Sequence, residues 1–96
     1  MPLYRCFIRG ENFPMMRDGE FQLMGFYTTR WVEAPTPEAA ETAGVDMLRA
    51  EYRFSDEEKQ RAPNARVYFE EVVEVPSDTP RIPPNGGATW FEMETD

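Results

Sequence analysis

The chain contains no histidine. This absence removes the most common general base, the Ser–His and Cys–His nucleophile pairs, and the commonest zinc ligand. The pair Gly86-Gly87 follows two prolines and lacks the spacing of a phosphate-binding loop. We therefore assign no catalytic residue, no metal ligand and no cofactor.

Cysteine and long apolar runs are also scarce. Cys6 is the single cysteine, so the chain cannot form an internal disulfide, which fits a reducing compartment. We expect Cys6 to be a small buried hydrophobic residue. The N-terminus lacks the pattern of a secretory signal, and no apolar run approaches the ~20 residues that span a bilayer. We expect a cytoplasmic protein without membrane association.

Acidic residues outnumber basic ones: the chain has eighteen Asp and Glu but only ten Lys and Arg, which gives a net charge of -8. The imbalance is uneven, because residues 1–37 hold four arginines and four acidic residues, so the whole excess lies in residues 38–96. Lys59 is the only lysine. Nucleic-acid affinity requires a basic footprint that releases counterions, so we do not favour nucleic-acid binding.

Core-forming residues are abundant. Hydrophobic residues make up 41% of the chain, with seven Phe, four Tyr and two Trp, which excludes a disordered chain despite nine prolines. A length of 96 residues fits one domain with one core. We place that α+β domain at residues 1–75.

Two strands are expected first. Residues 3–13 alternate, with Tyr4, Cys6 and Ile8 on one face and Arg5, Phe7 and Arg9 on the other. Asp18-Gly19 predicts a tight turn, and the aromatic and β-branched residues of 21–33 predict the second strand. Pro14 predicts a break or bulge near Phe13-Pro14, which leaves the hairpin register open by one residue.

Helix signals follow the hairpin. Thr36-Pro37 combines an N-cap hydroxyl with a first-turn proline and predicts a helix to about residue 53. Gly44 on this helix predicts close approach to the sheet. Ser55 and Glu58 have the spacing of a capping box and predict a second, short helix.

A third strand and an arm complete the chain. Residues 65–75 predict a strand whose apolar parity is interrupted by Glu71. Residues 76–96 form a Pro/Gly-rich arm with a short strand at 88–93, which belongs to the same domain or to a dimer. The arm could fold onto its own sheet, add to a partner's sheet, or act as an exposed recognition segment.

A hairpin followed by a crossover helix and a third strand predicts an antiparallel sheet. In this sheet the third strand lies beside the first, and the helix covers one face. This β-β-α-β unit is half of a ferredoxin-like fold. The stretch from Thr36 to Ala43, which follows an aromatic strand, also resembles the strand-to-helix transition of HicB-like small bacterial domains. The resemblance implies a fold and no function.

Two groups of residues are candidates for binding. The candidate interaction surface consists of Arg5, Phe7, Arg9, Arg30, Trp90 and Phe91. Its arginines could form cross-strand salt bridges with Glu70 and Glu74, contact a protein or small anion, or clamp nucleic acid. Glu71 could reach a sheet edge, pair with an arginine, or mark a pocket with Tyr27 and Tyr68.

Carboxylates cluster at residues 56–58 and at Glu70, Glu71 and Glu74. These clusters are either solvated faces or ligands of a hard cation.

Our leading hypothesis is a non-catalytic interaction module, a homodimer that associates through its open sheet face or its arm. The alternative is a small-ligand-binding protein, or an enzyme that uses carboxylate, tyrosine or arginine groups. Nucleic-acid binding through an Arg-aromatic face is the third hypothesis.

Overall fold

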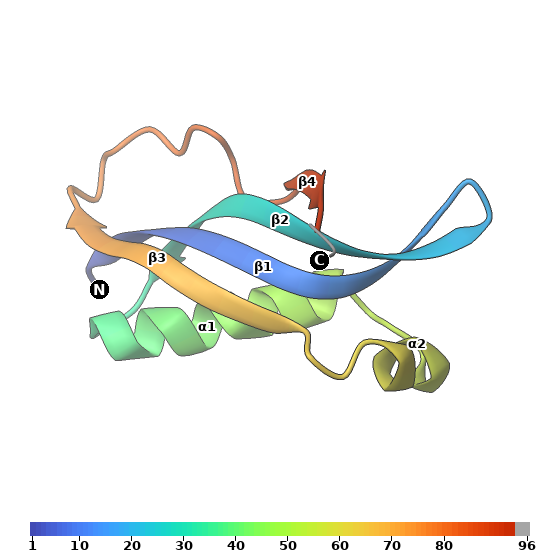
Figure 1. Ribbon diagram of the computed structural model, residues 1–96. Coiled ribbons are helices and arrows are strands. Elements are labelled where there is room, and N and C mark those ends of the chain that lie inside the picture. The colour runs from blue at the N-terminus through green and yellow to red at the C-terminus, as the bar shows by residue number, and fades with distance from the viewer. Residues whose placement is uncertain (94–96) are drawn as a thin grey trace.

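The computed structural model of the protein describes residues 1–93, except for the side chain of Arg17 (Figure 1). Its elements, in chain order, are β1 (Leu3–Arg17), β2 (Glu20–Glu33), α1 (Pro37–Glu51), α2 (Asp56–Arg61), β3 (Arg66–Val75) and β4 (Thr89–Glu92). No helix in this part of the chain is long and apolar enough to cross a bilayer.

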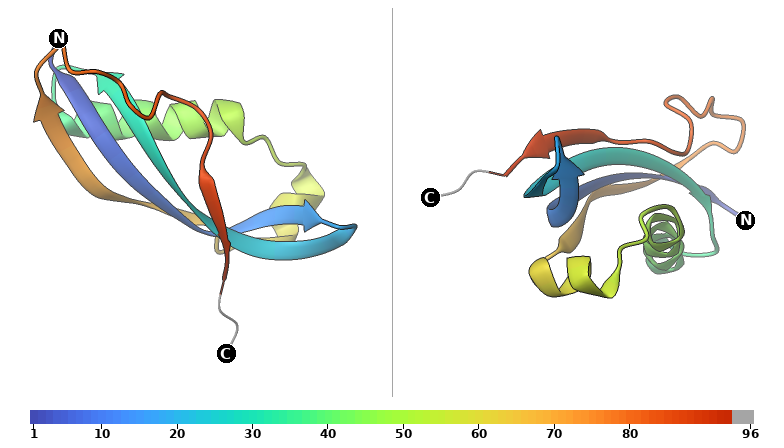
Figure 2. Two further views of the ribbon diagram at one scale, coloured as in Figure 1. Left: turned by 90° about the horizontal axis from the view of Figure 1, so that it is seen from above. Right: turned by 90° about the vertical axis from the view of Figure 1, so that its right-hand side faces the viewer.

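All neighbouring strands of the single sheet are antiparallel, in the order β3-β1-β2-β4. Both helices lie on one face of the sheet, and the arm that leads to β4 lies on the side away from them (Figure 2). The α+β class and the antiparallel sheet are therefore confirmed. The strand order does not confirm the half-ferredoxin-like, HicB-like topology, because β4 adds a fourth strand beside β2.

The hairpin contains a bulge slightly earlier than predicted. The register between β1 and β2 shifts between Gly10 and Phe13, and Asn12 has a φ of 59°. Asparagine tolerates this left-handed conformation better than most residues. Pro14 does not end the strand: it lies opposite Leu23, and β1 continues to Arg17.

A second bulge, in the pairing of β3 with β1, changes which residues of β3 point toward the helices. Glu71 lies opposite Phe7, whereas Phe69 lies opposite Ile8, so one extra residue, Glu70, is inserted between the two pairs. Val67, Phe69 and Val72 therefore pack against the core. The prediction that Glu71 interrupts the apolar face is wrong, because the bulge moves Glu71 to the opposite face.

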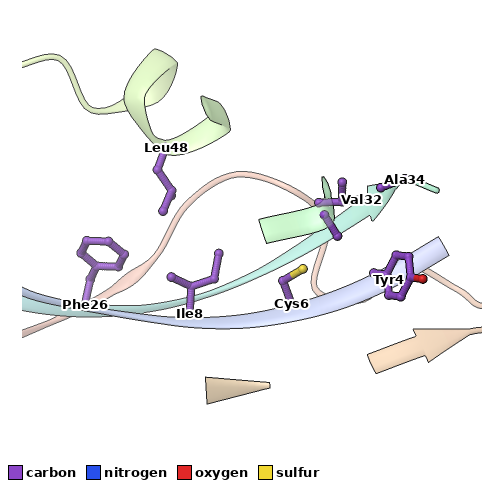
Figure 3. Packing of buried hydrophobic residues seen from close by; sticks show 8 residues of the cluster. Tyr4, Cys6, Ile8, Phe26, Val32, Ala34 and Leu48 are labelled. Atoms are coloured by element: carbon purple, nitrogen blue, oxygen red, sulfur yellow. The ribbon is translucent and has the colours of Figure 1, made fainter. Parts of the chain in front are cut away.

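The core lies between the sheet and α1. Tyr4, Cys6 and Ile8, predicted to share one face of β1, are all buried in one cluster that also contains Phe26 of β2 and Leu48 of α1 (Figure 3). Gly44 packs closely against β3, since a Cβ atom there would lie 3.0 Å from the Phe69 ring. The close approach predicted for Gly44 is thus confirmed.

Both predicted helix starts are confirmed. The hydroxyl of Thr36 accepts a hydrogen bond from the backbone N–H of Ala39 at 3.1 Å. Ser55 and Glu58 form the complete capping box of α2. These interactions satisfy backbone donors that the first helical turn leaves without partners.

The arm covers the outer edge of β2. Asn85 accepts a hydrogen bond from Trp31 N at 2.7 Å and donates one to Trp31 O at 3.1 Å, which is how a neighbouring strand would pair. The indole of Trp31 donates to Pro83 O at 2.7 Å. Residues 89–92 then pair with residues 24–27. Of its three predicted arrangements, the arm adopts the one on its own sheet.

Candidate functional site

Part of the predicted interaction surface lies on the sheet face that points away from the helices. We call this surface the open sheet face and define it by six residues: Arg5, Phe7, Arg9, Tyr27, Tyr68 and Phe91. The Phe7 and Tyr27 rings are stacked with centroids 5.5 Å apart, and the Phe91 ring lies 5.2 Å from Tyr27. The Arg9 guanidinium lies 4.9 Å from the Tyr68 ring centroid.

The two arginines of the open sheet face already have acidic partners. Arg5 pairs with Glu71 at 3.5 Å, and Arg9 lies 2.8 Å from both Glu70 and Glu11. Cross-strand pairing with Glu70 is therefore confirmed, whereas Glu71 takes the place predicted for Glu74. These partly exposed ion pairs contribute little stability, but they neutralise the charge that a nucleic-acid contact would need.

Arg30 and Trp90 lie on the helix-facing side, so the structure divides the predicted surface in two. Arg30 is opposite Cys6, and directly opposed residues share a face. Arg30 therefore does not share a surface with Arg5 and Arg9, contrary to the prediction from the sequence. The Trp90 ring lies 5.1 Å from Phe26 and 5.5 Å from Tyr52 and packs, partly buried, against the core.

The buried guanidinium of Arg30 connects β2, α1 and the arm. It donates to Thr28 Oγ1 at 3.0 Å, to Glu51 Oε2 at 2.5 Å and to Gly87 O at 3.1 Å. The other Glu51 oxygen accepts from Gly87 N at 3.2 Å. The hydrogen bond from Arg30 lowers the pKa of Glu51. Each charge is satisfied within the protein, so we assign this network a structural role.

The structure separates the residues of the predicted pocket. Tyr27 is on β2, whereas Tyr68 and Glu71 are on β3, with β1 between them. Of the three, Tyr27 lines a space of about 300 Å³ between the sheet and the arm residues 83–89.

A larger cavity of about 580 Å³ lies where the end of α1, α2 and the start of β3 meet the hairpin. We call it the basic cavity. Its apolar lining consists of Phe13, Val45, Leu48, Tyr52, Phe54, Ala65 and Val67. Its remaining lining residues are all cationic: Arg49, Arg53, Lys59 and Arg66.

Local structure explains how these side chains converge. Val45, Leu48, Arg49 and Tyr52 follow helical spacing and therefore share one side of α1 and its end. The next residues turn away, and the Phe54 ring packs 6.0 Å from Phe13 of the hairpin. The capping box then fixes the start of α2, which carries Lys59.

The lining of the basic cavity is positively charged, although the chain as a whole is acidic. Four of the ten basic residues line it, and no acidic residue in the described part of the chain does so. Within residues 1–93, no ion pair joins Arg49, Arg53 or Lys59 to a carboxylate. Arg66 donates to the carbonyl oxygens of Ala65 and Pro63, which do not cancel its charge.

Tyr52 lines the basic cavity, and its hydroxyl interacts with Glu51 and Arg30. Burial and the neighbouring Glu51 carboxylate raise the pKa of its hydroxyl. The hydroxyl is therefore neutral near pH 7.

Sequence reasoning missed the basic cavity because four separate segments build it. One signal was present: Arg49 and Arg53 place two like charges four residues apart, one in the last turn of α1 and one just after its end.

Metal-binding and thiol chemistry have little support among the residues that the structure describes. No group of three or more Cys, Asp or Glu side chains there could hold a metal ion. Cys6 is fully buried, and burial, followed by the charge of Glu41, raises the pKa of its thiol to about 11. Its reactive thiolate form is therefore scarce at neutral pH.

Comparisons with known proteins identify no relative of this chain. The chain matches no protein-family model, and neither the curated proteins nor the solved structures contain a significant match to it.

Proposed function

We propose that this protein is a non-catalytic module that binds a small ligand in the basic cavity. The observation that carries the proposal is a largely apolar cavity of about 580 Å³ with four convergent cations at its rim. Small-molecule sites typically have volumes of roughly 300–1,000 Å³ and combine apolar walls with a few polar groups that orient the ligand.

The lining favours binding over catalysis. It offers apolar walls, guanidinium and ammonium groups, and one tyrosine whose pKa is raised. Among the described residues, those that line the cavity include no carboxylate, imidazole or thiol that could act as a general base or nucleophile. The walls come from α1 and β3, so much of the site is supported by regular secondary structure.

A neutral fluorescent probe tests whether the cavity binds ligands. We expect N-phenylnaphthylamine to bind with enhanced fluorescence, because burial of apolar surface is favourable at roughly 25 cal/mol per Å². Ala65→Phe places a ring in the cavity and should abolish this signal. Ala50→Phe is the matched control, since Ala50 is exposed on α1 and does not line the cavity.

The proposal fails if the wild-type protein gives no signal, or if both variants bind the probe as the wild type does. Circular dichroism of each variant establishes that it is folded before binding is compared.

Self-association through the open sheet face is the second candidate function. Tyr27 and Tyr68 are 40% and 43% exposed beside Phe7 and Phe91, which leaves aromatic surface uncovered. The face carries arginines and glutamates, so a second copy related by a two-fold axis could match its charges. We therefore retain a homodimer as a proposal.

The topology of the sheet and the location of the protein are two further proposals. The placement of β1 between β2 and β3 with α1 on one face supports a half-ferredoxin-like, HicB-like description of the β1-β2-α1-β3 unit. The single buried cysteine supports a cytoplasmic location.

A further inference from the structure

We propose that the ligand of the basic cavity is an amphipathic anion: an apolar chain or ring that carries one carboxylate or phosphate group. This inference rests on the proposed binding function and adds the chemical class of the ligand. It requires a ligand whose apolar part contacts the apolar walls while its charged group contacts the cations.

The apolar part of the ligand has a defined place. Phe13 and Phe54 approach from the hairpin and the interhelical loop, and Leu48 and Val67 from α1 and β3. These side chains belong to four different segments but form one continuous lining. A hydrocarbon body in contact with them loses water from both surfaces, which is the main source of affinity in such sites.

The charged part would lie at the rim. Arg49 and Arg53 are exposed at the end of α1 and just beyond it, and Lys59 is exposed on α2. Since none of these three has an ion-pair partner within residues 1–93, their donors are available to a ligand. Guanidinium groups bind carboxylate and phosphate oxygens in bidentate geometry.

The basic cavity brings like charges together. Arg49, Arg53, Lys59 and Arg66 all line it, and positive charges that lie close together repel one another. One anionic group among four cations converts this repulsion into attraction. Ligand binding should therefore also stabilise the folded protein.

Other ligand classes fit less well. A cation would meet four like charges, and a neutral apolar molecule would leave those charges beside hydrocarbon without compensation. A polyanion such as RNA would extend beyond the cavity and meet the rest of a chain whose net charge is -8. A small molecule with a single anionic group avoids each of these costs.

Three ligands with the same alkyl chain test the inference: decanoate, decanol and decyltrimethylammonium. Each is titrated below its micelle concentration against protein loaded with the neutral probe N-phenylnaphthylamine. We expect decanoate to displace the probe at a concentration about tenfold or more below that of decanol, because charge-assisted hydrogen bonds are stronger than neutral ones. Decyltrimethylammonium should be the weakest ligand.

Charge-neutralising variants locate the head-group site. Arg53→Gln and Lys59→Gln should each raise the dissociation constant of decanoate by about tenfold and leave that of decanol within about twofold. Arg81→Gln is the matched control, because Arg81 is an exposed arginine that pairs with Glu33, outside the cavity. It should change neither value.

The outcomes separate the two proposals. If decanol and decanoate bind equally well, or if the two cavity variants do not weaken decanoate, the inference about an anionic ligand is wrong and the binding function stands. If neither the probe nor any of the three ligands binds, the binding function is wrong as well.

Discussion

At Gly25 the sheet has no room for a side chain. A Cβ atom there would lie 2.2 Å from the Phe91 ring and 2.9 Å from the carbonyl oxygen of Gly10. The glycine therefore allows Phe91 to lie flat against β2 and reach Tyr27.

We expect Gly25→Ala to lower the free energy of unfolding by about 1–3 kcal/mol, the usual cost of overpacking. Urea denaturation measures this change. Combining it with Phe91→Ala should recover part of the loss, since the ring is one of the two groups in the way. An additive double variant would show that the ring is not involved.

The pair of Arg30 and Glu51 is the residue-scale link between α1 and the arm. Glu51→Gln leaves a cation at 2% exposure without a charged partner. We expect it to lower the free energy of unfolding by about 2 kcal/mol. This value is below the roughly 3–5 kcal/mol for breaking a fully buried pair, because Glu51 is 31% exposed and solvent screens it.

The same pair predicts a pH dependence. Folding lowers the pKa of Glu51, so its contribution is fully present above the unfolded-state pKa of about 4.3 and is lost as the pH falls through the folded-state pKa. The stability difference between wild type and Glu51→Gln should therefore be constant near neutral pH and shrink below about pH 4. A difference that grows on acidification would contradict this role.

At the scale of elements, local signals were predictable and pairing irregularities were not. The caps at Thr36 and Ser55 depend on residues within four positions of each other, so their sequences specify them. The bulge at Glu70 depends on which residue of β1 lies opposite, and alternation along β3 alone cannot reveal it. Glu71 was therefore assigned to the wrong face.

The candidate site was less predictable than the fold. The Arg-aromatic part of the open sheet face followed from the alternation of β1, whereas Arg30 was misplaced because the hairpin register was open by one residue. The basic cavity joins Phe13 to residues 45–67 through tertiary packing, so no sequence window contains it.

The capping box of α2 offers a test at this scale. Ser55→Ala removes the hydroxyl that accepts from Glu58 N, at an expected cost of about 1 kcal/mol. Since α2 carries Lys59, loosening its start should also weaken decanoate binding to the basic cavity. Thermal unfolding and probe displacement measure the two effects, with Ser77→Ala in the arm as the control. Unchanged affinity in a destabilised Ser55→Ala protein would show that α2 does not shape the site.

At the scale of the whole molecule, the two edges of the sheet are protected differently. At one edge, β4 is only four residues long, and so short an edge strand offers little backbone for pairing with another chain. The outer edge of β3 carries a bulge and several glutamates, which oppose pairing with another strand. Association between copies is therefore expected through the open sheet face and not through strand edges.

Sedimentation across a range of protein concentrations tests this expectation. We expect a concentration-dependent dimer that Tyr27→Glu converts to a monomer, because the new charge lies in the centre of the aromatic surface. Ile82→Glu is the control, since Ile82 is exposed on the arm. A monomer at every concentration, or a dimer that persists in Tyr27→Glu, would exclude this interface.

Binding of a small amphipathic anion in the basic cavity can be tested directly. Titration of decanoate into isotope-labelled protein, followed by NMR, tests both the binding and its location. We expect the largest amide shift changes at residues 45–54 and 65–67, around Leu48 and Tyr52. Shift changes that cluster on Phe7, Tyr27 and Phe91 of the open sheet face, or the absence of any saturable change, would contradict it.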